Sequence, residues 1–196
     1  MEKDNLNTQE WWNAQYGESG FYQDRVITDW QLWHDFLLKA LPKKPSRILE
    51  VACGLAHNAK FAAEQGHFIV ATDQSEIAIE ENKIRFADKN IQYRCMELDE
   101  AISIFKNFDA IMAFEIIEHF KNPEIPLLQI YKSLSENGIF IFSVPHEEGK
   151  HAYLNLHYCY WNYNNTVERL FHCGFKKVLF FKDDFYKEHI MGVATK

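Results

Sequence analysis

The sequence contains few of the features that mark exported, zinc-knuckle or membrane proteins. Its four cysteines, among 196 residues, include no C-x-x-C pair, which favours reduced thiols over a zinc knuckle or a disulfide framework. No apolar run is long enough to span a bilayer, and the first residues, MEKDNLNTQEWW, are polar and acidic. We therefore expect a cytoplasmic protein without a membrane partner.

The sequence also has fewer basic than acidic residues. Lys and Arg total 21 against 28 Asp and Glu, so the formal net charge is −7. This balance gives no net attraction to a phosphate backbone, and nucleic acid is not an expected partner. Hydrophobic residues make up 47% and charged residues 25%, as in ordinary globular proteins. The length suits one hydrophobic core.

Pro42 and Pro45 interrupt the helical pattern of the first forty residues. We place a boundary there, with residues 1–44 as an N-terminal helical cap or lid and residues 45–196 as the core of a single domain. In the core, short apolar runs alternate with helix-length segments, which is typical of parallel βαβ units. The runs FKKVLFF and IMGVAT near the end are too close for a crossover helix and should pair antiparallel.

The predicted fold is therefore α/β, with a Rossmann-like, doubly wound sheet. We expect seven strands, mostly parallel, with an antiparallel C-terminal hairpin. Helices are expected at about residues 58–65, 76–89 and 126–135, and a last helix within HYCYWNYNNTVERLFHCGF.

The turn after the first core strand is poor in glycine. Ala52, Gly54 and Ala56 occupy the three spaced small-residue positions of an x-G-x-G-x-G turn. An alanine methyl would crowd a pyrophosphate lying on the backbone, whereas a ligand without phosphates tolerates it better. Glu50 closes the strand before the turn, and Asp73 ends the second strand, where an acid can accept hydrogen bonds from both hydroxyls of a ribose.

These features resemble class I S-adenosylmethionine (SAM)-dependent methyltransferases. The resemblance continues through FDAIMAFEIIEHFKNPEIPLLQIYKSLSENGIFIFSVP, in which one strand ends near Glu-x-x-Glu-His and another finishes in Val-Pro. It covers roughly residue 45 to the end and is closest to the small-molecule methyltransferases of ubiquinone biosynthesis. It implies SAM as cofactor, S-adenosylhomocysteine as product, and a small-molecule acceptor that is methylated on an oxygen.

The resemblance also implies a cofactor site built after the four central strands. The residues that it assigns are Glu50, Ala52 and Gly54 for the methionine part, Ala113 and Phe114 beside the sulfonium, Asp73 and Gln74 for the ribose, and Glu97 and the Leu98 backbone N–H for the adenine, with Asp99 as a substitute for Glu97.

His119, in EIIEH, is the predicted catalytic residue, because an imidazole has the right pKa to take a proton from an acceptor hydroxyl. The main prediction includes no metal. An alternative joins Glu115, Glu118 and His119 with a later histidine in a metal site, an arrangement that resembles metal-dependent RNA 2′-O-methyltransferases. The histidines available for it are His146, His151 and His157.

A second alternative is a regulatory module that binds SAM without catalysis. The sequence leaves a monomer and a homodimer equally open.

Overall fold

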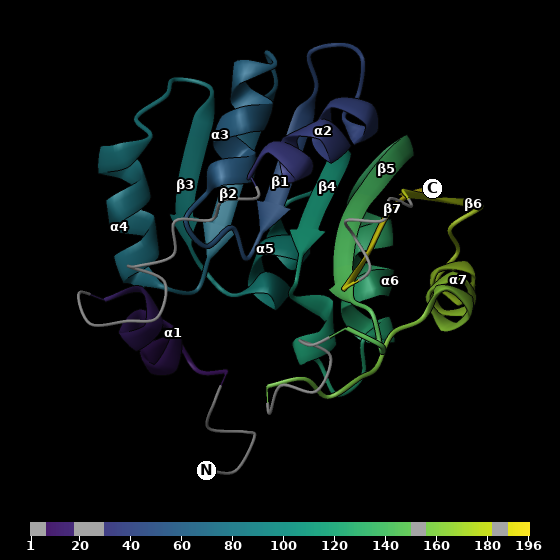
Figure 1. The fold of residues 1–196 in the computed structure, drawn as a ribbon. Helices are drawn as coiled ribbons and strands as arrows, with labels where there is room; N and C mark the ends of the chain where they lie inside the picture. Colours follow the sequence, from purple (N-terminus) through teal and green to yellow (C-terminus); the bar gives the residue numbers. More distant parts are fainter. Residues whose placement is uncertain (1–6, 18–29, 150–155, 182–187) are drawn as a thin grey trace.

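The computed structural model describes residues 7–17, 30–149, 156–181 and 188–196. Within these ranges one sheet of seven strands has the order β3-β2-β1-β4-β5-β7-β6 (Figure 1). Strand β7 runs antiparallel to both β5 and β6, so the predicted sheet and its C-terminal hairpin are confirmed. The strands are β1 (Arg47–Val51), β2 (Phe68–Asp73), β3 (Ile91–Cys95), β4 (Phe108–Phe114), β5 (Leu134–Pro145), β6 (Lys177–Phe181) and β7 (His189–Thr195).

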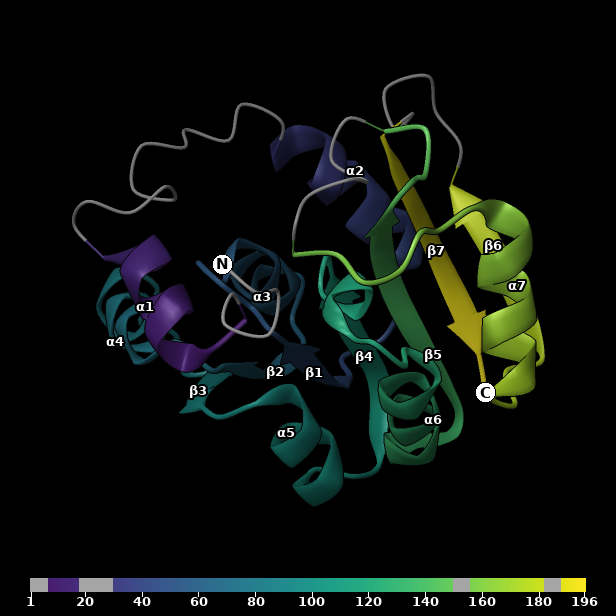
Figure 2. The ribbon, with the colours of Figure 1, turned by 90° about the horizontal axis from the view of Figure 1, so that it is seen from below.

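Helices cover both faces of the sheet. Helices α2, α3 and α4 lie on one face and α5, α6 and α7 on the other, while α1 lies against α4 near the carboxyl ends of the strands (Figure 2). The helices are α1 (Gln9–Tyr16), α2 (Trp30–Ala40), α3 (His57–Glu64), α4 (Glu76–Arg85), α5 (Leu98–Ile104), the 3-10 turn η2 (Ile117–His119), α6 (Glu124–Ser133) and α7 (Tyr163–His172).

The predicted helices are present, with shifted ends. Helix α4 stops at Arg85, because Phe86 leaves the helical region with φ −126° and Asp88 then accepts the Asn90 N–H in a turn into β3. Helix α7 starts only at Tyr163, after a capping box at Asn162. Helix α5 was not among the predicted elements, since it is only seven residues long.

Alternate residues of the central strands face two separate cores, as a period of two requires. Leu49 of β1 packs in the core beneath α5, α6 and α7, whereas its neighbour Ile48 packs in the core beneath α2, α3 and α4. Phe36 and Leu37 of α2 are fully buried in this second core. Helix α2 is therefore packed on the sheet, whereas α1 lies at the strand ends, and the predicted division at residue 44 stays a prediction.

Two expectations from composition can be compared with the described residues. The four cysteines are free thiols, as predicted. None of the described helices has both the length and the apolar character needed to cross a membrane.

Glu50 places a carboxyl group inside the sheet, directly before the glycine-poor turn. The residue is only 2% exposed, and its Oε2 has no hydrogen-bond partner among the described residues. Burial raises the pKa of Glu50 to about 8, although hydrogen bonds from the Ala59 backbone and the Asn58 side chain act in the opposite direction. The folded chain therefore holds this carboxyl group largely protonated at neutral pH.

The raised pKa predicts that Glu50 costs stability as the pH rises. The unfolded chain releases this proton near its ordinary pKa of 4.5, whereas the folded chain keeps it up to about 8. Between these values the folded state binds more protons, so one such group lowers the free energy of unfolding by up to about 1.4 kcal/mol per pH unit. Glu50→Gln cannot ionise, and its stability advantage over wild type should grow across this window.

Urea denaturation of both proteins at several pH values measures this difference. Glu136→Gln, at an exposed position on β5, is the matched control and should follow wild type at every pH. A difference between Glu50→Gln and wild type that does not change with pH would show that Glu50 is ionised in the folded chain.

Candidate active site

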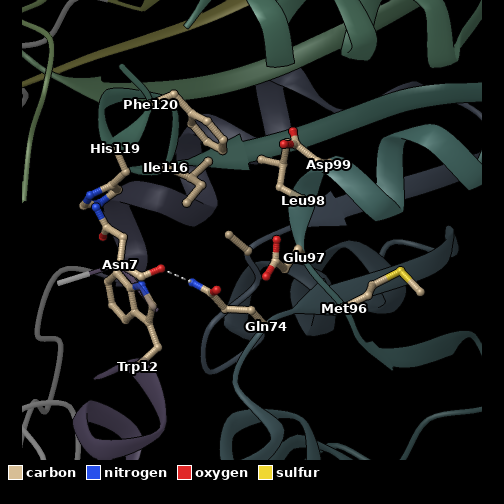
Figure 3. Close-up of a pocket in the computed structure, with 11 residues that line it drawn as sticks. Asn7, Trp12, Gln74, Met96, Glu97, Leu98, Asp99, Ile116, His119 and Phe120 are labelled. Carbon is tan, nitrogen blue, oxygen red and sulfur yellow. Dashed lines mark hydrogen bonds between the residues drawn. The ribbon is translucent and has the colours of Figure 1, made fainter. Parts of the chain in front are cut away.

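A pocket opens at the carboxyl ends of the parallel strands (Figure 3). The loops that follow β1, β2, β3 and β4 each contribute to its wall, as expected for a ligand site in a doubly wound sheet. Its remaining side is formed by Trp12 of helix α1 and by Asn7, which precedes this helix. The lining residues are Asn7, Trp12, Ala52, Gln74, Met96, Glu97, Leu98, Asp99, Ile116, His119 and Phe120.

The turn after β1 keeps a glycine-type backbone path despite its alanines. Ala52, Gly54 and Ala56 all have left-handed conformations, with φ of 51°, 49° and 53°. A side chain in this region costs roughly 1–2 kcal/mol, so the surrounding structure must hold the two alanines in place.

Asp73, at the end of β2, supplies much of that support. Its carboxylate accepts the N–H groups of Gly54 and Ser75, each at 2.8 Å. The side-chain amide of Asn82 donates to the Gly54 carbonyl at 2.7 Å. Burial still raises the pKa of Asp73, and the two N–H donors only partly oppose this effect. In the structure Asp73 therefore braces the turn.

Helix α1 covers the same turn from outside. A Cβ atom added to Gly54 would lie 2.6 Å from the hydroxyl oxygen of Tyr16, so only glycine fits beneath this side chain. Tyr16 is buried, and its ring stacks with that of Trp12 at a centroid distance of 6.1 Å. The part of the turn that the resemblance assigns to a methionine moiety therefore lies under α1.

The β3 side of the pocket offers hydrogen-bonding groups. Glu97 is the N-cap of α5, but its side chain makes no capping hydrogen bond. Leu98 opens the helix, where a backbone N–H has no acceptor within the helix itself. Across the pocket, Gln74 donates through Nε2 to the Asn7 carbonyl at 3.5 Å (Figure 3). These groups suit a ligand with both donors and acceptors, such as a purine.

Beyond β4, Glu115 is held in a hydrogen-bonded chain. It has φ 51°, and its carboxylate accepts the Ser143 hydroxyl at 2.6 Å and contacts His189 Nδ1 at 3.1 Å. The charge and hydrogen bond of His189 lower the pKa of Glu115 despite its burial, and Glu115 correspondingly raises the pKa of His189. Each side chain therefore favours the charged form of the other.

Glu118, His119 and His157 form a second cluster beside the pocket. Glu118 Oε1 lies 3.9 Å from Nε2 of each histidine. His119 Nδ1 lies 3.2 Å from the Leu156 carbonyl, which can only accept, so Nδ1 carries the proton and Nε2 the lone pair. Burial lowers the pKa of His119 to about 4 and raises that of Glu118 well above its usual range.

The structure brings five of the ten predicted site residues to the pocket wall. These are Ala52, Gln74, Glu97, Leu98 and His119. Gly54 and Asp73 lie behind the wall and shape it, and Glu50 lies deeper in the sheet.

The two residues assigned beside the sulfonium are not on the wall. Ala113 is fully buried in β4, and Phe114 packs its ring against Trp33 and Phe36. Ala113 belongs to the packed interior, and Phe114 is partly buried against the core beneath α2, α3 and α4.

Sequence reasoning missed five lining residues: Asn7, Trp12, Met96, Ile116 and Phe120. Met96, Ile116 and Phe120 adjoin predicted residues, so their positions alone could have indicated them. Asn7 and Trp12 reach the pocket only through the placement of α1. Of the other histidines considered, His146 packs against Tyr163, and His151 lies outside the described residues.

Known proteins share this fold. A SAM-dependent methyltransferase from Archaeoglobus fulgidus superposes with a TM-score of 0.69 at 16% identity, over 85% of this chain and 94% of that one. An S-adenosylmethionine-dependent methyltransferase from Mesorhizobium loti gives 0.66 at 16% identity, over 84% and 97%. At these identities the likeness concerns the fold.

Similar sequences carry the name ubiquinone biosynthesis O-methyltransferase. The Coxiella burnetii protein is 24% identical over 148 residues, and the Rickettsia typhi protein is 30% identical over 154 residues. Each match covers 74% of this chain, but the chain spans only 61% and 58% of those relatives. A malonyl-[acyl-carrier protein] O-methyltransferase from Anoxybacillus flavithermus is 28% identical over 113 residues, or 55% of this chain and 42% of that protein.

A family model described as a methyltransferase domain matches residues 22–178, which is most of the chain. The match includes β1 to β5, the turn braced by Asp73 and the cluster beyond β4. This chain therefore belongs to the methyltransferase domain family.

Proposed function

We propose that the chain transfers the methyl group of SAM to an oxygen of a small-molecule acceptor. The observation that carries this proposal is the pocket at the carboxyl ends of β1 to β4, where four of the predicted cofactor residues (Ala52, Gln74, Glu97 and Leu98) and His119 share one wall. SAM supplies a sulfonium-activated methyl group. The task of the chain is then to align the acceptor with it and to exclude water.

The donor set of the pocket suits SAM. Glu97 can accept from an exocyclic amino group, and the Leu98 N–H can donate to a ring nitrogen. Asp73 is 5% exposed and lies behind this wall, where it accepts two backbone N–H groups and holds the turn that shapes the pocket. Gln74, the next residue, lies on the wall. Ala52 lies on the wall and can contact the methionine part, whereas Gly54 lies beneath Tyr16.

Helix α1 is placed to shield the reaction from water. Trp12 lines the pocket, and its ring lies edge-on to that of His119 at a centroid distance of 5.9 Å. The Trp12 indole therefore joins helix α1 to the part of the pocket wall formed by His119.

The choice of an oxygen acceptor is supported by two observations. The relatives named above are called O-methyltransferases, for ubiquinone biosynthesis and for a malonyl group on a carrier protein. His119 presents the lone pair of a neutral Nε2 to an acceptor hydroxyl. Burial lowers the pKa of His119 to about 4, so it is a weaker base than the sequence predicts and can take the proton only as the methyl group arrives. A negative net charge disfavours RNA as the acceptor.

The first prediction concerns cofactor binding. Glu97→Ala removes a charged acceptor from the adenine end, so SAM affinity should fall by about 2 kcal/mol, or roughly 30-fold in Kd. Because Glu97 makes no capping hydrogen bond, helix α5 should survive the change. Glu100→Ala, also exposed in the first turn of α5, is the control. Calorimetric titration with SAM that gives equal Kd values for both variants would remove Glu97 from the site.

The second prediction concerns the acceptor end. His119→Ala should lower kcat by roughly 10²- to 10⁴-fold while leaving the Kd for SAM within about threefold. S-adenosylhomocysteine release is measured with a panel of phenols, aliphatic alcohols and carboxylic acids. His172→Ala, an exposed histidine on α7, is the control. Full activity in His119→Ala would exclude a role for this side chain.

The same assay tests the alternatives. SAM binding without turnover on any acceptor would favour a regulatory module. Methylation of a short RNA in place of the small molecules, with binding that weakens steeply in salt, would overturn the proposed acceptor class.

A further inference from the structure

The side chains on the pocket wall favour a ligand that carries positive charge. Among the eleven described residues that line the pocket, Glu97 and Asp99 are acidic, and none is a lysine or an arginine. The wall also includes the indole of Trp12, which belongs to α1. Carboxylates attract a cation through their charge, and the face of an indole attracts it through the ring quadrupole.

Three aromatic rings hold the Trp12 indole in its orientation. Trp11 meets it edge-on at a centroid distance of 4.8 Å, and His119 meets it edge-on at 5.9 Å. Tyr16 stacks with it at 6.1 Å and an interplanar angle of 26°. Because these rings pack around the indole, its rotamer is set before a ligand binds.

Helix α1 is in turn attached to the start of α4. The hydroxyl group of Ser75, the N-cap of α4, donates to Asn13 Oδ1 at 2.8 Å. At the other end of α1, Thr8 caps the helix by accepting the Trp11 N–H at 3.2 Å. Trp12 lies between these two attachment points, so the backbone that carries the indole is also fixed.

The position of Trp12 relative to the cofactor rests on the proposed function, in which the adenine lies at Glu97 and the acceptor at His119. The transferred methyl group must point toward the acceptor, so the sulfonium lies toward the His119 end of the pocket. Trp12 is on the same side of the pocket as His119 and across from Met96 (Figure 3). Cation–π attraction acts within about 6 Å of the ring centroid, which brings a sulfonium at this end within its range.

We propose that Trp12 makes the pocket prefer the charged methyl donor over the neutral product. In the transfer, the bond between sulfur and the methyl carbon breaks, and its electron pair stays on the sulfur. The methyl carbon bonds to the acceptor oxygen, which loses its proton. S-adenosylhomocysteine is therefore a neutral thioether, and the indole attracts it less than it attracts the sulfonium. The loss of this attraction favours product release after each transfer.

Calorimetric titration of the full chain with SAM and with S-adenosylhomocysteine tests this preference. Trp12→Leu keeps an apolar side chain but removes the aromatic face. The ratio of the Kd for S-adenosylhomocysteine to the Kd for SAM should therefore fall by roughly 3- to 30-fold. Trp12→Phe keeps an aromatic face and should retain most of the ratio. Trp11→Leu, on the same helix but not among the lining residues, is the matched control and should leave the ratio within about twofold.

Fluorinated tryptophan, incorporated during expression, gives a second measurement that decides the question if Trp12→Leu does not fold. Fluorine weakens the negative face of the indole with little change in its shape. All five tryptophans are then labelled, but among them only Trp12 is a described lining residue. Each added fluorine should weaken SAM binding further and leave S-adenosylhomocysteine binding unchanged. SAM affinity that does not respond to fluorination would contradict the proposal.

The two ligands separate this inference from the proposed function. An equal loss of affinity for both ligands in Trp12→Leu would show that the indole only packs in the wall, which overturns the preference and leaves methyl transfer standing. A changed ratio without transfer to any acceptor would support the preference and remove the proposed transfer. A wild-type chain that binds neither ligand would overturn both.

Discussion

The carboxylate of Asp73 holds the loop architecture of the pocket together. By accepting the N–H groups of Gly54 and Ser75, it joins the turn after β1 to the start of α4. Two alanines in left-handed conformations are tolerated only in a turn that is braced in this way. Tyr16 of α1 packs on Gly54, which has no side chain to keep it away. The position of α1 therefore also depends on the hydrogen bonds that Asp73 makes to this turn.

Three buried acidic residues near the pocket differ in how many hydrogen-bond donors surround the carboxyl group. Asp73 has two backbone donors and acts as a structural brace. Glu50 has a backbone donor and a side-chain donor but keeps one oxygen without a partner. Glu118 has no donor from any other described residue, and only its own backbone N–H favours its charged form. Burial raises the pKa of all three, and the least satisfied acid is the one beside two imidazoles.

The fold that this chain shares with other methyltransferases comes from its strands and helices, whereas the details of the site come from its loops. Solved methyltransferases at 16% identity keep the fold, so many different sequences satisfy the alternation of strands and helices. The details of the pocket lie in the loops, where alanine occupies positions 52 and 56 and where His157 approaches Glu118. Loops carry function in this way because a rigid sheet fixes their ends.

Local sequence alone determined the sheet, its C-terminal hairpin and the place of the turn, because apolar periodicity and backbone preferences act between near neighbours. The resemblance to methyltransferases added Ala52 and Glu97, which directly follow predicted strands, and His119 lies a few residues beyond the end of another, at Phe114. The tertiary structure decided what depends on distant segments: Tyr16 lies over Gly54, Phe114 faces Trp33, and Glu115 is taken by His189. It also chose His157 over His146 as the neighbour of Glu118. No short-range pattern encodes such pairings, because they form only when the packed sheet brings the ends of separate strands together.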